Sequence, residues 1–163
     1  MENTYLNRGA QTKNARLVSY LNSSGLFLLT LLWSYAVFAK LADLQLYQRQ
    51  MEEQPFSNVI TIALTYLIPT LELISATLLI LNRHRLGLWI SLSLLLGFTI
   101  YIILILSHVF PKVPCSCGGL ISKMSWKNHL YFNLLLISIN VLCLVHTEKR
   151  ERRLTGKEKN KST

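Results

Sequence analysis

The sequence has little charge and little cysteine for its length. Charged residues make up 15% of its 163 positions, hydrophobic residues make up 51%, and there are three cysteines. A disordered chain needs low hydrophobicity and high net charge, and a small disulfide-rich secreted protein needs many more cysteines. Both classes are therefore excluded. The sequence also contains no internal repeat, and its one low-complexity segment is a basic C-terminal tail.

Acidic residues are scarce as well, since 8 Asp and Glu stand against 17 Lys and Arg, for a formal net charge of +9. In a soluble protein this excess would indicate a nucleic-acid partner. The apolar residues indicate a membrane protein instead. They form four blocks of about 17–25 residues, the length at which a helix crosses the hydrocarbon core of a bilayer. A soluble domain would interrupt such runs with polar faces. We therefore predict that the basic residues flank membrane spans. A nucleic-acid partner is not expected.

The predicted fold class is an all-α integral membrane four-helix bundle. A single transmembrane domain is expected over residues 19–146, with spans at about 19–39, 58–81, 86–109 and 126–145. Only four residues, Asn82 to Arg85, separate the second span from the third, so these two form an antiparallel helical hairpin. Pro69 inside the second span predicts a kink. The first span is not interpreted as a signal peptide, because a long polar segment precedes it and no small-residue cleavage site follows it.

The distribution of Lys and Arg predicts the orientation of the bundle. Cytoplasmic segments of membrane proteins are enriched in these residues. With the N-terminus in the cytoplasm, 12 of the 17 basic residues lie in cytoplasmic segments and 5 lie outside. We therefore expect a multi-pass protein of the cell inner membrane with both termini in the cytoplasm. Residues 1–18 form the cytoplasmic N-terminal segment, and the charged tail at 147–163 is expected to be disordered.

Two connections then lie on the outer side. The first, at 40–57, is predicted to be a helix on the membrane surface, because it carries apolar residues at helical spacing: Leu41, Leu44, Tyr47 and Met51. The second begins near residue 110 and contains Cys115 and Cys117. Pro114 before this pair and two glycines after it favour the sharp turn that a disulfide across one intervening residue requires.

Cys115 and Cys117 are the candidate catalytic residues. A disulfide between them would close a small, strained ring on the oxidising side of the membrane, and strained, exposed disulfides exchange readily with thiols. Three other roles stay open for the pair: an inert local disulfide, half of a metal site completed by His108 or His129, and two unused thiols. Since there is no second cysteine pair, no metal site is predicted.

Three ionisable residues are candidates for tuning thiol pKa values or for proton transfer. His108 ends the third span and His129 begins the fourth, so both rings are expected near the cysteines, where an imidazolium would favour the reactive thiolate. The alternative for each is an interfacial histidine bonded to a carbonyl or a lipid headgroup. Glu72 lies in an apolar run, where an ionisable group is costly and marks a functional site. It could hold a proton, pair with a polar group on another helix, face a quinone-like ligand, or form a structural interhelical hydrogen bond.

Further polar residues are expected to join the helices. Asn133 and Asn140 are seven positions apart and share one face of the fourth span. Lys40 and Asp43, three positions apart, can pair at the outer end of the first helix. The third cysteine, Cys143, lies deep in the fourth span and is interpreted as a packing residue.

Several short segments together carry a family resemblance. They are Tyr35–Asp43, Pro69–Leu73, Pro114–Gly119 and Ser125–Trp126. In this order they resemble the MauE/DoxX-like membrane proteins, the methylamine utilisation MauE type in particular. The resemblance implies a four-helix membrane bundle associated with redox maturation of exported proteins, alongside a thioredoxin-like partner. The wider DoxX group further implies quinone-linked electron transfer. The positions that match the family pattern are Lys40, Asp43, Glu72, Cys115 and Cys117.

The sequence therefore predicts a membrane thiol–disulfide redox protein, which would act in maturation of exported proteins or in electron transfer to them. Cys115 and Cys117 would react, and a quinone is the candidate cofactor. The expected partners are the lipid bilayer and a thioredoxin-like or disulfide-containing exported protein. The alternative is a non-catalytic scaffold or assembly subunit, in which the cysteine pair is a structural disulfide.

Overall fold

The computed structural model describes residues 2–109 and 125–159, and within these ranges the side chains of residues 16–109 and 125–153. The described residues form five helices and no strand: α1 (Glu2–Ala42), α2 (Leu44–Glu52), α3 (Asn58–Ile80), α4 (His84–Leu106) and α5 (Trp126–Lys159). All but α2 contain a segment long and apolar enough to cross a membrane. The predicted all-α four-helix membrane bundle is thereby confirmed.

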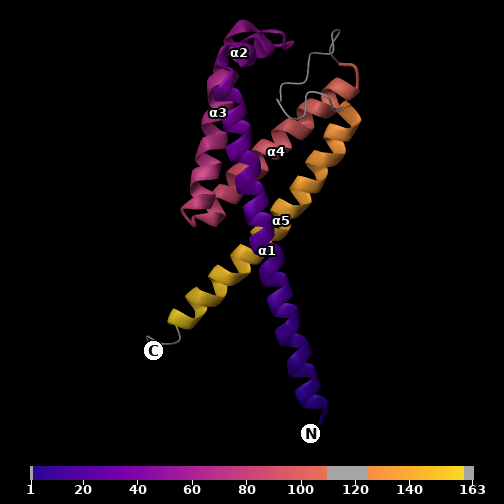
Figure 1. Ribbon diagram of the computed structural model, residues 1–163, viewed down its shortest axis with the longest axis vertical. Coiled ribbons are helices and arrows are strands. Elements are labelled where there is room, and N and C mark those ends of the chain that lie inside the picture. Colours follow the sequence, from indigo (N-terminus) through magenta and orange to yellow (C-terminus); the bar gives the residue numbers. More distant parts are fainter. Residues whose placement is uncertain (1, 110–124, 160–163) are drawn as a thin grey trace.

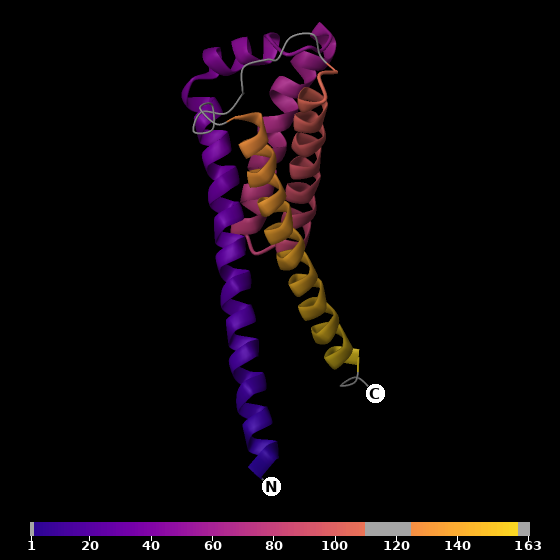
Figure 2. The same cartoon turned by 90° about the vertical axis from the view of Figure 1, so that its right-hand side faces the viewer.

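The four long helices pack as a ring in the order α1, α3, α4, α5, with α5 returning to α1. The short helix α2 lies across one end of this ring (Figure 2). We call this the α2 end; α1 and α4 end there, and α3 and α5 begin there. The opposite end, here called the turn end, holds the turn between α3 and α4. Both chain termini lie beyond the turn end (Figures 1 and 2), as an even number of spans requires.

The predicted hairpin of the second and third spans is the α3–α4 pair. Its turn depends on Asn82, whose φ of 60° lies in the left-handed region that asparagine tolerates better than most residues. Close packing follows directly after the turn. Gly87 lies so near α3 that a Cβ atom there would meet the side chain of Leu79 at 3.0 Å. Its carbonyl also accepts a hydrogen bond from Ser75 Oγ at 3.2 Å.

The helices differ in length from the predicted spans. α1 begins at Glu2, well before the first predicted span. α5 continues to Lys159, so residues 147–159 of the tail are helical where disorder was predicted. Hydropathy marks where lipid ends, but a helix can continue in water when its side chains support it. Glu148 and Arg152 are one turn apart on α5 with opposite charges, an arrangement that favours such a continuation. α3 also runs through Pro69 as one helix.

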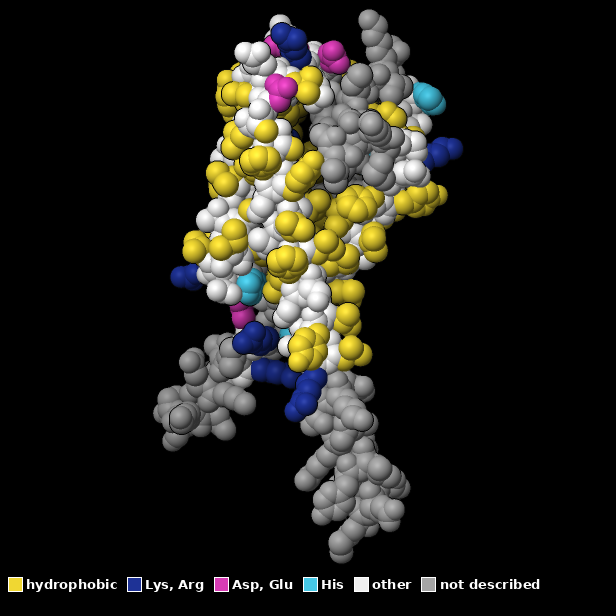
Figure 3. Space-filling model, viewed as in Figure 1, with side chains coloured by type: hydrophobic (Ala, Val, Ile, Leu, Met, Phe, Trp, Pro, Cys, Tyr) yellow, Lys and Arg dark blue, Asp and Glu magenta, His cyan; other side chains and the backbone are white. Residues whose placement is uncertain are grey.

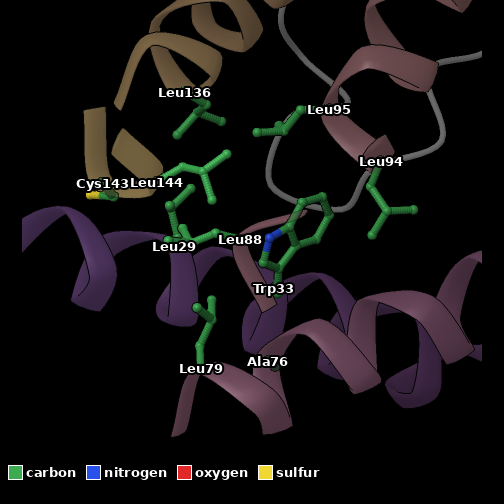
Figure 4. Packing of buried hydrophobic residues seen from close by; sticks show 10 residues of the cluster. All are labelled: Leu29, Trp33, Ala76, Leu79, Leu88, Leu94, Leu95, Leu136, Cys143 and Leu144. Carbon is green, nitrogen blue, oxygen red and sulfur yellow. The ribbon is translucent and has the colours of Figure 1, made fainter. Parts of the chain in front are cut away.

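The core at the centre of the bundle contains side chains from all four spans (Figure 4). They are mostly leucines, together with Trp33, Ala76 and Cys143. Many large apolar side chains lie exposed on the outside, where Figure 3 shows them covering the middle of the molecule between charged ends. In lipid such exposure costs nothing, so the hydrophobic effect does not draw these helices together. Close packing and interhelical hydrogen bonds must therefore hold the bundle.

Candidate functional site

A buried ion pair joins the first two spans. Lys40 in the last turn of α1 donates from Nζ to both carboxylate oxygens of Glu72 on α3, at 2.8 and 2.9 Å. Glu72 is 1% exposed, and the side chain of Lys40 is 15% exposed. Lys40 therefore pairs with Glu72 and not with Asp43, the partner that the sequence spacing allowed. Asp43 instead caps α2, because its side chain accepts a hydrogen bond from the backbone N–H of Leu46 at 2.9 Å.

Glu72 lies near the middle of α3, where an isolated charge would cost roughly several kcal/mol even after relaxation of the surroundings. The ammonium of Lys40 offsets this cost by engaging both oxygens at once. Of the roles considered for Glu72, the structure therefore shows a pairing with a polar group on another helix. The same contacts do not fit a quinone ligand at this position. Both carboxylate oxygens are already held by Lys40, and a quinone carbonyl has no access to a side chain that is 1% exposed.

The helix α2 covers this ion pair from the α2 end. It forms where apolar residues at helical spacing predict a surface helix, and its buried residues are Tyr47 and Met51. The ring centroid of Tyr47 lies 5.8 Å from Nζ of Lys40, within the range of a cation–π contact. The lysine thus lies between a carboxylate and an aromatic face.

A second set of polar contacts holds α4 against α5. Asn133 donates from Nδ2 to Thr99 Oγ1 at 2.9 Å and to the carbonyl of Leu95 at 3.1 Å. One heptad later, Nδ2 of Asn140 donates to Ser91 Oγ at 2.6 Å. Both asparagines of α5 therefore donate hydrogen bonds to α4.

Sequence reasoning did not identify two partners in this network. Ser91 Oγ accepts a second hydrogen bond from the indole Nε1 of Trp33 on α1 at 2.8 Å, so a single hydroxyl connects three helices. The sequence pattern marks Ser91 only as a small residue. A sequence signal for Trp33 does exist, because tryptophan in a membrane protein usually lies at the lipid–water interface and this one lies well inside a span.

Four ring side chains form a chain of contacts at the α2 end, which we call the aromatic chain: Phe56, Tyr101, Trp126 and His129. Successive ring centroids are 5.8, 6.5 and 6.0 Å apart. The hydroxyl of Tyr101 also hydrogen-bonds Oε1 of Gln54. The aromatic chain therefore ties the connection between α2 and α3 to α4 and to the first turn of α5. The roles of Tyr101 and Gln54 were not predicted from the sequence.

Cys115 and Cys117 lie outside the described residues, but the residues that flank their segment do not. Val109 follows α4 and Ser125 precedes α5, so both lie at the α2 end. His108 is exposed and has a φ of 53°, in the left-handed region, which helps to terminate α4. His129 is half-buried against Trp126.

The remaining cysteine lies toward the turn end. Cys143 is buried on α5, and its Sγ lies 3.7 Å from the backbone carbonyl of Asn22 on α1. This position agrees with a packing role. Among the described residues, no three His, Cys, Asp or Glu side chains come together as a set of metal ligands.

Comparison with known proteins gives one family match. The family model for the methylamine utilisation protein MauE matches residues 18–146, a range that includes all four spans and the segment with the cysteine pair. No curated protein and no solved structure matches the chain.

Proposed function

Because this chain belongs to the MauE family of methylamine utilisation proteins, we propose that it is a membrane thiol–disulfide redox protein serving exported proteins. Family membership and the four apolar helices make it a multi-pass membrane protein of methylamine utilisation. Within that role, Cys115 and Cys117 are the proposed reactive residues, and a thioredoxin-like protein is the proposed partner.

The observation that carries the proposal is where the cysteine segment is attached. Its flanking residues, Val109 and Ser125, lie at the same end of the bundle. The Tyr101–Trp126 contact of the aromatic chain holds the helices on either side of the segment together at this end. His129 belongs to the same chain. A dithiol attached to such a fixed end would meet a soluble partner at the membrane surface.

The proposed reaction is thiol–disulfide exchange. The thiolate of one cysteine attacks a sulfur of the partner's disulfide, which forms a mixed disulfide and releases the partner's other sulfur as a thiolate. The second cysteine then attacks the mixed disulfide. The partner leaves as a dithiol, the cysteine pair is left as a disulfide, and two electrons have passed to the partner. The reverse sequence moves two electrons the other way, and the two reduction potentials decide the direction.

The proposed location is the inner membrane, with both termini in the cytoplasm. Seven exposed basic residues surround the turn end, and we call them the basic collar: Arg16, Arg83, Arg85, Lys149, Arg150, Arg152 and Arg153. The described acidic residues there are Glu148 and Glu151. At the α2 end, the exposed charged residues among those that the structure describes are Arg49 and Lys127 and the acidic residues Asp43, Glu52 and Glu53. Positive charge favours the cytoplasmic side, so the α2 end would face the oxidising compartment in which disulfides persist.

The proposal is tested by replacing the cysteine pair. A strain carrying Cys115→Ser with Cys117→Ser should lose growth on methylamine while keeping normal amounts of the protein in the membrane. Cys143→Ser is the matched control, since that thiol is buried at the α1–α5 contact, and it should grow normally. Full growth of the double variant at normal abundance would exclude the redox role.

A non-catalytic assembly subunit is the second candidate, and the closed interior of the bundle favours it. Glu72 and Ser91 are engaged by neighbouring helices rather than turned toward a substrate. Thiol trapping in intact cells separates the two functions. A pair that is partly reduced, or a mixed disulfide with a thioredoxin-like protein trapped by Cys117→Ser alone, favours exchange. A pair that is always oxidised favours the subunit.

A further inference from the structure

The basic collar lies at the level where lipid headgroups meet the protein. Arg16 lies three residues before the first predicted span on α1, and Arg83 directly precedes α4. On α5, Lys149 and Arg153 follow the apolar run by four and eight residues, which places them about 6 and 12 Å beyond Val145 along the helix axis. The headgroup region extends about 5–7 Å from the hydrocarbon core. Since α5 is inclined to α1 (Figure 1), Lys149 and Arg153 lie closer to the core along the direction of α1 than these distances along the axis of α5.

The described carboxylates at the turn end neutralise only part of the collar. Arg85 lies 4.0 Å from Glu148 and 3.7 Å from Glu151, and Arg152 lies 4.0 Å from Glu148, so these residues form exposed ion pairs. Seven basic side chains against two carboxylates still leave an excess of five positive charges among the described side chains of this end. Among the side chains that the structure describes, the other five members of the collar have no carboxylate within 4.0 Å.

The start of α4 adds further positive potential between these side chains. Arg83 is the N-cap residue of α4 and makes no side-chain capping hydrogen bond, and the first turn contains no acidic residue. The first amide groups of a helix carry partial positive charge and lack partners within the helix. Arg83 and Arg85 flank these amides. An anion at this place would therefore meet both fixed dipoles and guanidinium groups.

We propose that the basic collar binds anionic phospholipid headgroups of the leaflet at the turn end. A guanidinium group can donate two parallel hydrogen bonds to two oxygens of one phosphate. Clusters of basic residues next to membrane spans attract anionic lipids. The collar is exposed, lies at headgroup height and has the complementary charge. The proposal does not depend on the cysteine chemistry or on which leaflet faces the cytoplasm.

The test uses the full chain reconstituted in phosphatidylcholine vesicles that contain spin-labelled phosphatidylglycerol or spin-labelled phosphatidylcholine. Electron paramagnetic resonance then gives the association constant of each labelled lipid for the protein surface. The wild-type protein should prefer phosphatidylglycerol at least threefold at low ionic strength. The preference should disappear in 1 M salt, where the Debye length is about 3 Å. This comparison requires no variant, so it does not depend on how a variant folds.

Variants assign the preference to the collar. Arg83→Gln, Arg85→Gln, Arg150→Gln and Arg153→Gln combined should bring the ratio of the two association constants close to one. The matched control is Arg49→Gln with Lys127→Gln, which removes two exposed charges at the α2 end and should leave the ratio unchanged.

Two results would overturn the proposal. One is equal association constants of the two lipids for the wild-type protein at low ionic strength, which would favour a soluble acidic partner for the collar instead of lipid. The other is an equal loss of preference in the control, which would show that total charge and not the collar attracts the lipid.

Discussion

Lys40 on α1 and Glu72 on α3 form the buried ion pair of this bundle, with one ammonium nitrogen 2.8 and 2.9 Å from the two carboxylate oxygens. The two residues are 32 positions apart in the chain, and their contact connects the end of the first span to the middle of the second. Because one charge compensates the other inside the bundle, the pair should behave as a unit when either residue is replaced.

Loss of one partner should therefore destabilise the protein far more than loss of both. Lys40→Met leaves an uncompensated carboxylate and should lower the free energy of unfolding by about 3–5 kcal/mol. Lys40→Met combined with Glu72→Leu should restore stability to within about 1 kcal/mol of the wild type, since a buried pair barely outweighs its desolvation. Unfolding in mixed micelles measures the free energy of unfolding of the single and the double variant. Arg85→Gln is the control at an exposed ion pair, where at most about 1 kcal/mol is expected.

An equal loss in the single and the double variant would contradict this description. It would mean that the two side chains stabilise the bundle by their shape and not by their charges.

The two asparagines of α5 should differ in their contribution to stability. Asn133→Leu removes two hydrogen bonds to α4 and should cost about 1–2 kcal/mol, since such bonds in membranes average about 0.6 kcal/mol each. Asn140→Leu removes one bond and also an Oδ1 atom that is buried without a partner among the described residues. That change should be nearly neutral. Unfolding of both variants in the same micelles compares them, and a larger loss at Asn140 would refute the assignment.

The aromatic chain should control the order of the first turns of α5. Tyr101→Ala removes its ring contacts with Phe56 and Trp126, and should speed amide hydrogen exchange over residues 126–132 by about tenfold or more. Tyr101→Phe keeps the ring and loses the hydrogen bond to Gln54, so exchange there should change much less. Identical exchange in Tyr101→Ala and the wild type would show that Tyr101 does not hold this turn in place.

Close packing between α1 and α5 should make Gly25 sensitive to a single methyl group. A Cβ atom at Gly25 would lie 2.5 Å from Sγ of Cys143 and 3.2 Å from Cγ2 of Ile139. Gly25→Ala should therefore cost about 1–3 kcal/mol through overpacking. Cys143→Ala removes the nearest atom, so Gly25→Ala combined with Cys143→Ala should recover at least half of that loss. If the losses in the free energy of unfolding of the two single variants simply add in the double variant, the strain at Gly25 does not come from Cys143. Gly97→Ala is the control, since a Cβ atom at Gly97 would meet no described atom within 4 Å.

Properties that depend on short stretches of chain could be predicted from the sequence. The length of each apolar run determined that there are four spans, because a helix needs about 20 residues to cross the hydrocarbon core. The short link around Asn82 determined the hairpin, since so few residues allow the chain only to turn back. Spacing of apolar residues likewise indicated the helix α2, and the seven-residue separation of Asn133 and Asn140 indicated their shared face. Each of these follows from geometry within one helix or one turn.

Partners between helices were decided only by the tertiary structure. Asp43 is three positions from Lys40 and Glu72 is 32 positions away, yet α1 and α3 meet in the rotation and register that place Glu72 against the ammonium. The same holds for Ser91, which receives Trp33 and Asn140 from two other helices. Hydrophobic periodicity says which residues can lie in lipid, but not how far each helix is turned or shifted against its neighbours. That rotation and shift result from close packing of the whole bundle, which no single segment contains.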